Sequence, residues 1–284
     1  MNRKFKRIVQ GEMGVDGAGV HLYHVLSRHT MEDTDPMLLL DAFDSTDPTK
    51  YEAGFPMHPH RGLETISYVY HGTMVHRDSL GNEDAINDGE VQWMTAGSGI
   101  LHEEKLPPRD RLFGVQIWLN LSKKDKWTSP EYFSINKDEI KEIDFDGGYL
   151  RLLAGKYLDN EGFKSKHQPV NYYDIHIEPG KKFEIDIEDD DSITLFALIG
   201  EAFVEDEKLP NFNAGILNMD GNKVVIENKS EEEVAILFFS SKRLDEPIAW
   251  TPGPIVMNTQ EELDTAYQEI KDGNFIKDKI DMNK

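Results

Sequence analysis

Apolar and polar side chains alternate along short runs of this chain, and this period of two is the feature that most restricts its fold. Residues 113–121 place an apolar side chain at every odd position, which predicts a half-buried strand with one apolar face. Further strands are predicted at Leu38–Phe43, Thr65–Tyr70, Tyr149–Leu153, Phe183–Ile187, Thr194–Ile199 and Val234–Phe239. Glycine-containing turn signals separate such runs, for example at 80–82, 88–89, 179–180 and 220–221. Many short strands at this spacing predict an all-β sandwich or barrel.

An internal similarity indicates two related domains. The runs Thr65–Tyr70 and Thr194–Ile199 are each followed by a glycine and a further predicted strand. The polar stretch Ser122–Asp144 interrupts the strands between these two halves. We therefore expect one β-domain within residues 1–134 and a second within residues 145–284.

One α-helix is predicted close to the end of the sequence. Thr259 and Glu262 have the spacing of a capping box, and Gly273 is a plausible stop signal. The apolar residues that follow the cap with helical spacing are Leu263, Ala266, Tyr267 and Ile270. We expect this helix to pack on a sheet edge.

The charge of the chain argues against some classes of partner. With 53 acidic and 31 basic side chains, the formal net charge is -22, which repels a phosphate backbone. The basic residues near the start, Arg3, Lys4, Lys6 and Arg7, are expected to form a solvated edge. Direct binding to nucleic acid is therefore not expected.

Cysteine usage and hydropathy limit the chemistry and the location. The sequence has no cysteine, which excludes disulfides, thiolate ligands and a cysteine nucleophile. No stretch approaches the roughly 18 apolar residues of a membrane span. Residues 1–10 lack the apolar run of a secretory signal. A cytoplasmic protein without a membrane partner is expected.

Two short segments carry a metal-ligand pattern. His58 and His60 stand two residues apart, so in a strand both imidazoles project to one side, about 7 Å apart along the chain. His102 and Glu104 repeat this spacing after a glycine-rich segment. Glu64 has the same parity as the first pair. Three neutral imidazoles and a carboxylate suit a divalent ion such as Fe, Mn, Ni, Cu or Co. We expect a β-barrel to bring the two segments together around one ion.

The other histidines are not assigned to the ion. His76 lies in a predicted strand and is a weaker candidate for lining the pocket. The remaining histidines, interpreted as surface or locally hydrogen-bonded residues, are His21, His24, His29, His71, His167 and His176.

Several segments resemble the pirin family of cupins. Residues 55–65 (FPMHPHRGLET) closely resemble the first metal motif of that family, and residues 89–104 (GEVQWMTAGSGILHEE) resemble the second. Other segments that resemble pirins lie at 35–41, 116–121, 246–248 and 253–258. The resemblance extends from about residue 30 to residue 275.

The resemblance implies a bicupin: two antiparallel β-barrels of the double-stranded β-helix (jelly-roll) type with a short C-terminal helix, and iron, Fe(II), bound in the first barrel. The family's metal ligands correspond to His58, His60, His102 and Glu104. A typical single-domain cupin would instead use Glu64, which is here expected to orient an imidazole.

The second domain is expected to lack a metal site. Alignment of its glycine turn with that of the first domain places Asp186 and Glu188 at the positions of His58 and His60. No histidine follows Ser192 in the sequence. Solvated strand residues are the favoured interpretation of the two carboxylates.

The resemblance also implies an activity, the oxygen-dependent cleavage of the flavonol quercetin, by a quercetin 2,3-dioxygenase-type reaction. Glu104, or Glu64 beside it, would act as the general base for the flavonol hydroxyl. Trp93, Met94 and Trp118 are candidates for an apolar wall, although core packing is favoured for each. The first alternative is a non-enzymatic, redox-sensing regulatory protein that binds a protein partner. The second is a barrel that the metal mainly stabilises.

Overall fold

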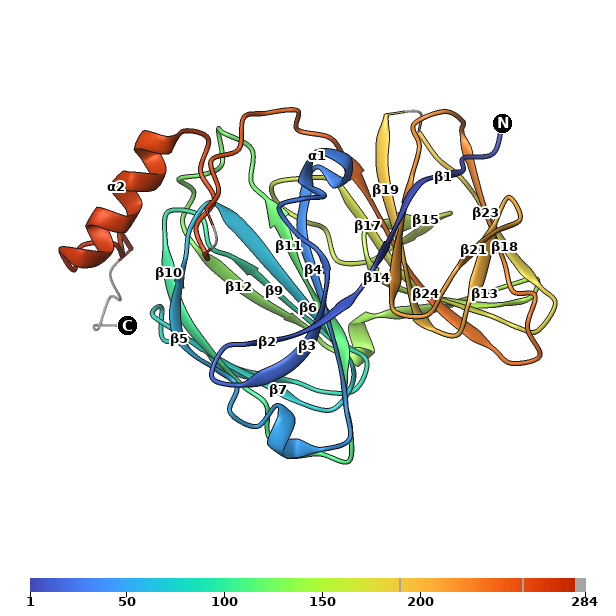
Figure 1. Cartoon of the computed structure of the whole chain (residues 1–284), viewed down its shortest axis with the longest axis horizontal. Coiled ribbons are helices and arrows are strands. Elements are labelled where there is room, and N and C mark those ends of the chain that lie inside the picture. The colour runs from blue at the N-terminus through green and yellow to red at the C-terminus, as the bar shows by residue number, and fades with distance from the viewer. Residues whose placement is uncertain (189, 252, 279–284) are drawn as a thin grey trace. The chain divides into compact units, whose positions relative to one another are not determined.

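The structure is a computed structural model that describes residues 1–188, 190–251 and 253–278. Strands dominate it, as predicted, and they form two compact units that each contain a seven-stranded and a four-stranded antiparallel sheet (Figure 1). The first barrel consists of residues 13–22, residues 37–137 and the described residues from Leu244 onward. The second barrel consists of residues 1–12, 23–36 and 138–243.

The first barrel has a core of apolar side chains contributed by both of its sheets, including Val20, Phe43, Val69, Met74 and Ile86. Its larger sheet has the order β12 (Glu131–Ile135), β9 (Glu90–Thr95), β6 (Leu63–His71), β11 (Leu112–Asn120), β4 (Met37–Ser45), β3 (Val20–Leu26), β2 (Glu12–Asp16). Its smaller sheet has the order β5 (Phe55–His60), β10 (Ile100–Lys105), β7 (Met74–Asp78), β8 (Glu83–Ile86).

The second barrel likewise has a core contributed by both sheets, including Leu150, Tyr173, Phe183, Leu195 and Ile226. Its larger sheet has the order β1 (Phe5–Gln10), β22 (Asn213–Leu217), β19 (Asp191–Ile199), β24 (Val234–Lys242), β17 (Val170–Ile177), β14 (Gly148–Ala154), β13 (Lys141–Phe145). Its smaller sheet has the order β18 (Lys182–Asp186), β23 (Lys223–Glu227), β20 (Ala202–Val204), β21 (Glu207–Leu209). The short strands β15 (Lys156–Tyr157) and β16 (Asn160–Glu161) form a separate pair.

The two barrels share one strand order, which explains the internal similarity of the sequence. The order β9-β6-β11-β4 in the first barrel corresponds to β22-β19-β24-β17 in the second. The order β5-β10-β7-β8 corresponds in the same way to β18-β23-β20-β21. The similar runs Thr65–Tyr70 and Thr194–Ile199 lie in the corresponding strands β6 and β19. The repeat is therefore one fold used twice.

The ends of the chain belong to the opposite units from those that their sequence position suggests. Strand β1 pairs with β22 of the second barrel, while the described residues from Leu244 onward belong to the first barrel. The predicted domains, 1–134 and 145–284, follow the central strands but place these terminal segments differently. Side-chain alternation predicts a strand without indicating which sheet edge it joins.

Strand β11 contains the run predicted at 113–121, but its polar face is not turned to solvent. Val115, Ile117 and Leu119 are buried, as expected. Gln116 and Trp118 are half-buried, and Gln116 hydrogen-bonds to Glu104 of the smaller sheet. The prediction of a strand is confirmed, whereas the interpretation of a half-buried strand is wrong because its polar face lines the interior of the barrel. The other predicted runs lie in, or within one residue of, β4, β6, β14, β18, β19 and β24.

Helical structure is scarce in the described residues. The C-terminal helix α2 (Gln260–Lys271) begins with the predicted capping box of Thr259 and Glu262. Leu263 and Ala266 are buried, whereas Ile270 is 37% exposed, so only part of the apolar stripe packs. The shorter helices are α1 (Met31–Thr34) and two 3-10 turns, Pro48–Lys50 and Lys137–Glu139. Among the described residues, no helix has the length and apolar character needed to span a bilayer.

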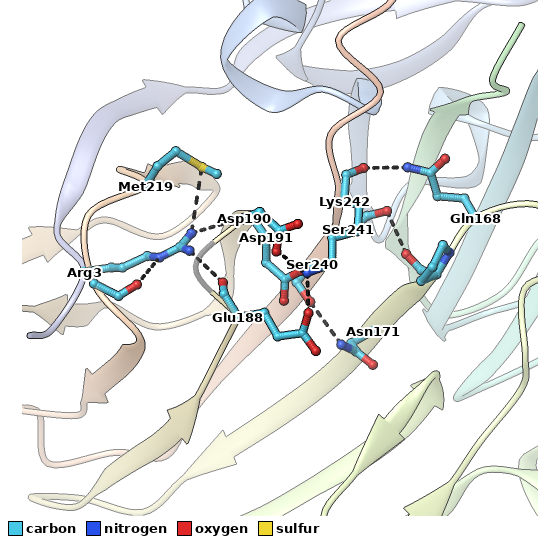
Figure 2. Close-up of polar contacts among 12 residues, drawn as sticks. Arg3, Gln168, Asn171, Glu188, Asp190, Asp191, Met219, Ser240, Ser241 and Lys242 are labelled. Atoms are coloured by element: carbon cyan, nitrogen blue, oxygen red, sulfur yellow. Dashed lines mark hydrogen bonds and ion pairs between the residues drawn. The ribbon is translucent and has the colours of Figure 1, made fainter.

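Arg3 corrects the expectation that the basic residues near the start form a solvated edge. Its side chain is fully buried in the second barrel. The guanidinium donates hydrogen bonds to the carbonyl oxygens of Gly221 at 3.0 Å, Glu188 at 2.9 Å and Asp191. Figure 2 shows the Arg3 side chain pointing into this group. The N-terminal segment is thereby fixed to two loops of the barrel.

We expect Arg3→Met to lower the free energy of unfolding by about 1–3 kcal/mol, because the buried guanidinium and its hydrogen bonds to three carbonyl oxygens are lost. Arg7→Met is the matched control, since Arg7 has 46% of its side chain exposed and lies 3.6 Å from Asp33. The control should change stability by less than about 0.5 kcal/mol. Chemical denaturation of both variants measures the difference, and equal effects would contradict this role of Arg3.

Candidate metal centre

Two adjacent strands of the smaller sheet bring the predicted histidines together in the first barrel. Strand β5 pairs with β10 so that His58 lies directly opposite His102, and His60 lies opposite Ile100. Directly paired residues project to the same face of a sheet, with Cβ atoms about 4.5–5.5 Å apart. His60 shares this face because it follows His58 by two residues. The two histidine segments are therefore hydrogen-bonded neighbours, which their separation in the sequence does not indicate.

A β-bulge changes the register immediately beyond this pair. Glu104 lies opposite Phe55, although a regular ladder would place it opposite Pro56. Proline has no backbone N–H to donate to the ladder, which suits an irregular position in an edge strand. Such a bulge re-aims the side chains beyond it. The extra residue is on β5, whereas β10 stays in regular register with β7, so Glu104 lies on the same face of β10 as His102.

The three imidazole rings converge. Their centroids are 4.9 Å apart for His58 and His60, 4.4 Å for His58 and His102, and 5.0 Å for His60 and His102. One ligand nitrogen of each ring lies within 4.8 Å of the others. His60 and His102 are buried and His58 is half-buried. The convergence that the sequence predicts for the histidines is present.

The outer nitrogens of two rings fix their tautomers. His58 Nδ1 lies 2.8 Å from the carbonyl oxygen of Pro56, and His60 Nδ1 lies 3.0 Å from that of Pro254. A carbonyl oxygen only accepts, so each Nδ1 carries the proton and each Nε2 keeps a lone pair. The two Nε2 atoms face each other at 3.1 Å. Two lone pairs at this distance repel each other unless a cation or a hydrogen-bond donor lies between them.

Burial favours the neutral form of the His60 and His102 imidazoles. It lowers the pKa of His60 well below the usual range, with His58 adding to the effect and the hydrogen bond to Pro254 opposing it. Burial also lowers the pKa of His102 well below the usual range, and the neighbouring histidines add to it. A neutral imidazole is the form that binds a metal.

The arrangement fits one transition-metal ion. Two nitrogens at adjacent positions of an octahedral ion, each about 2.1 Å from the metal, lie about 3 Å apart. The Nε2 atoms of His58 and His60 are 3.1 Å apart. Nε2 of His102 is buried and has no hydrogen-bond partner among the described residues. The three converging imidazoles form a candidate three-histidine metal site.

Glu104 lies near the histidines but outside the group of mutually close ligand atoms. It is buried, and Gln92 Nε2 donates to its Oε1 at 3.0 Å. Gln116 Nε2 donates to Oε1 at 3.0 Å and to Oε2 at 3.1 Å. The two glutamines come from β9 and β11 of the larger sheet and hold the carboxylate inside the barrel. Neither glutamine was predicted as a site residue, although both lie within segments that resemble pirins.

Of the residues considered for a pocket wall, Trp118 borders the site. Its ring stands edge-on to His60, with centroids 4.9 Å apart and an interplanar angle of 86°. Trp118 Nε1 donates to Gln116 Oε1 at 3.2 Å. Trp93 and Met94 are buried in β9, which is the core packing favoured for them. Trp118 therefore borders the site, although core packing had been favoured for it as well.

Glu64, the alternative carboxylate ligand, lies on β6 outside the histidine group. It is buried directly opposite Thr95 of β9. Thr95 Oγ1 donates to Glu64 Oε1 at 2.6 Å. This hydrogen bond links the Glu64 carboxylate to strand β9.

Three histidines outside the group have contacts that show their roles. His71 and His176 hydrogen-bond locally to Asp88 and Glu233, each at 2.9 Å, as expected. His76 is fully buried, and its Nδ1 lies 3.4 Å from Nδ1 of His102. It therefore lies behind the site rather than at its open side.

The carbonyl that receives His60 belongs to a segment close to the end of the chain, residues 253–258, which we call the strap. Val256 N donates to the carbonyl oxygen of Arg61 at 3.0 Å. The buried Lys126 ammonium donates to Gly62 O at 2.7 Å, Asn120 Oδ1 at 2.6 Å and Val256 O at 2.9 Å. A Cβ at Gly62 would lie 2.0 Å from Val256 O, so this close approach requires glycine. The strap is therefore held firmly against the segment that follows His60.

The corresponding interior of the second barrel is apolar. Phe183 of β18 and Val224 and Ile226 of β23 are buried in its core. Asp186 and Glu188, which the sequence aligns with His58 and His60, have 87% and 77% of their side chains exposed. Both carboxylates are therefore exposed to solvent, as interpreted from the sequence.

A second group of acidic side chains, Glu188, Asp190 and Asp191, brings three carboxylates within 4.8 Å of one another. Figure 2 shows this group on the second barrel, with Lys242 beside it. The Lys242 ammonium pairs with Glu188, Asp190 and Asp191. The lysine supplies the positive charge that a cation would bring.

We expect Lys126→Met to lower the free energy of unfolding by about 1–3 kcal/mol at pH 7, because three buried acceptors lose their donor. Burial lowers the pKa of Lys126 to about 7, against the opposing charges of Glu246 and Glu262. The unfolded chain then binds more protons between pH 7 and the usual lysine range, so this lysine adds stability as the pH rises. The gap between wild type and Lys126→Met should widen from pH 7 to pH 9 in denaturation experiments. A gap independent of pH would contradict the lowered pKa.

Comparison with known proteins agrees with this architecture. The family profile described as Pirin matches residues 19–119, and the profile described as Pirin C-terminal cupin domain matches residues 172–276. The pirin-like protein of Caulobacter vibrioides is 34% identical over 278 residues, covering 96% of this chain and 99% of that protein. Human pirin is 32% identical over 264 residues, covering 90% of this chain and 88% of that protein.

A solved structure shows the same fold. The crystal structure of a quercetin 2,3-dioxygenase from Acinetobacter baumannii superposes with a TM-score of 0.88 and 34% sequence identity, covering 97% of this chain and 99% of that one. Both barrels are therefore cupin domains, as the resemblance implied. Together, the two family profiles and the relatives show that the chain belongs to the pirin family.

Proposed function

We propose that this protein binds one divalent transition-metal ion through His58, His60, His102 and Glu104 and uses it to open a flavonol with dioxygen. The observation that carries the proposal is the convergence of three imidazole rings in the first barrel, with one ligand nitrogen of each close to the others. A set of three imidazoles and one carboxylate suits Fe(II), our first choice, and also Mn, Ni, Cu or Co. Four protein ligands leave open positions on a six-coordinate ion, and open positions favour chemistry over a purely structural role.

The contacts of Glu104 support its assignment as the fourth ligand. Oε1 receives hydrogen bonds from Gln92 and Gln116, whereas Oε2 receives one, from Gln116. A carboxylate oxygen has two lone pairs, so Oε2 retains one that can face an ion. The glutamines orient the carboxylate in the way that hydrogen-bonded neighbours commonly support metal ligands.

The activity of the solved relative supports a flavonol as the substrate class. The protein from Acinetobacter baumannii is named a quercetin 2,3-dioxygenase. When bound, the metal would supply Lewis-acid polarisation of the chelating oxygens and the redox chemistry with dioxygen. Glu104 would accept the proton of the flavonol hydroxyl as general base. Trp118, half-buried beside His60, would offer an apolar ring surface to the planar substrate.

We expect protein loaded with Fe(II), Mn, Ni, Cu or Co to bind one ion per chain, and at least one form to consume dioxygen with quercetin. His102→Ala should abolish both metal binding and turnover, because it removes one of three converging ligands. His71→Ala is the control, since His71 lies outside the site. Oxygen uptake and loss of the flavonol absorption band measure turnover. Full occupancy without turnover for all five metals would exclude the enzymatic proposal and leave the metal site standing.

Glu104→Gln tests the role of the carboxylate. The amide keeps the shape of the side chain but removes its charge and its basicity, so we expect kcat for quercetin to fall by about 10²–10⁴-fold. Glu103→Gln is the matched control, because Glu103 lies outside the group of metal-ligand atoms and pairs with Arg77 and Lys105. Metal content is measured for both variants. Wild-type turnover by fully loaded Glu104→Gln would remove Glu104 from the mechanism.

A further inference from the structure

A buried carboxylate and a buried imidazole form a chain behind His102. His76 and Asp78 lie two residues apart on β7 and have fully buried side chains. His76 Nε2 lies 2.9 Å from Asp78 Oδ2, and His76 Nδ1 lies 3.4 Å from His102 Nδ1. Strand β7 is the neighbour of β10, with Asp78 directly opposite His102. The order of groups is thus carboxylate, imidazole, imidazole.

The surroundings of Asp78 determine where the proton of His76 lies. Asp78 Oδ1 accepts from the backbone N–H of Leu80 at 2.9 Å and of Asn82 at 3.1 Å. Oδ2 accepts from Asn82 Nδ2 at 2.8 Å. Burial raises the pKa of Asp78, but the hydrogen bonds from His76 and Asn82 outweigh it, so the pKa lies below its usual value. A carboxylate that only accepts requires the proton to be on Nε2 of His76.

This assignment continues through the chain to His102. With its proton on Nε2, a neutral His76 offers a lone pair at Nδ1. Nδ1 of His102 must then be the donor across the 3.4 Å contact, which leaves Nε2 of His102 unprotonated. That Nε2 is the buried atom without a hydrogen-bond partner among the described residues. Tyr132 stacks on His76 at 4.2 Å and 13°, which holds the plane of the ring.

We propose that Asp78 and His76 are positioning residues that set the tautomer of His102, so that its Nε2 lone pair faces the metal. In His58 and His60, the carbonyl oxygens of Pro56 and Pro254 fix the same tautomer, with the proton on Nδ1. In His102, the Asp78–His76 pair would fix this tautomer. This inference rests on the proposed assignment of His102 as a metal ligand.

Asp78→Asn is the most direct test, because it keeps the shape of the side chain but exchanges which nitrogen of His76 and of His102 carries the proton. The amide Oδ1 would keep the two backbone donors, so Nδ2 would replace Oδ2 and donate to His76, and the Asn82 amide would turn over to present its oxygen to this Nδ2. His76 would then carry its proton on Nδ1 and donate to His102 Nδ1. His102 would be left with its proton on Nε2, where it blocks a metal. Asp88→Asn is the matched control, since Asp88 accepts from His71 and Gly72 away from the site.

The tautomer is measured directly in the metal-free protein by NMR of chains labelled with ¹⁵N-histidine. In wild type and Asp88→Asn we expect His102 to be protonated at Nδ1 and unprotonated at Nε2. In Asp78→Asn we expect the opposite pattern. Protonation of His102 at Nε2 in the wild type, or an unchanged pattern in Asp78→Asn, would overturn the proposal. The wild-type spectrum decides even if the variant fails to fold.

Cobalt(II) affinity, measured by competition with a chelator, gives the functional readout. We expect Asp78→Asn to weaken cobalt binding by about 10–100-fold, with Asp88→Asn unchanged. His76→Phe keeps the ring stacked on Tyr132 but removes the acceptor, and should weaken binding in the same direction. Wild-type affinity in both variants would overturn the proposal. A flavonol that is not turned over, with these tautomers and affinities as expected, would exclude the proposed activity and not this inference.

Discussion

The direct pairing of His58 with His102 across β5 and β10 is the constraint on which the site depends. Two short segments become one ligand surface because residues opposite each other in a sheet project to the same face. A shift of one residue would turn a histidine segment to the other face. The larger sheet contributes the remaining neighbours of the site: the glutamines that hydrogen-bond to Glu104 and the tryptophan beside His60.

In each histidine of the group, the Nδ1 atom contacts a residue outside the three-histidine group. His58 uses its own strand, His60 uses the strap, and His102 uses His76. The strap joins the end of the chain to the site, because Lys126 fastens it to the residues after His60. A metal site of this kind is preorganised by its surroundings as much as by its ligands.

The sequence predicted the strands, the capped helix, the repeated fold and the convergence of the histidines, because alternation, spacing and the resemblance to pirins are local signals. It did not predict which barrel takes the ends of the chain, since sheet edges are chosen by long-range packing. Strand β11 was predicted to be half-buried, but its second face lies inside the barrel, where Gln116 contacts Glu104 and Trp118 borders His60. Arg3 was misjudged for a similar reason, as its carbonyl partners lie on distant loops.

Anomalous diffraction at the absorption edge of the bound metal, from crystals of protein loaded with one equivalent of iron or cobalt, locates the ion. We expect a single peak in the first barrel, bonded to Nε2 of His58, His60 and His102 and to a carboxylate oxygen of Glu104. The interior of the second barrel should show none. A peak elsewhere, or three imidazoles without metal between them at full loading, would show that these residues do not form the metal site.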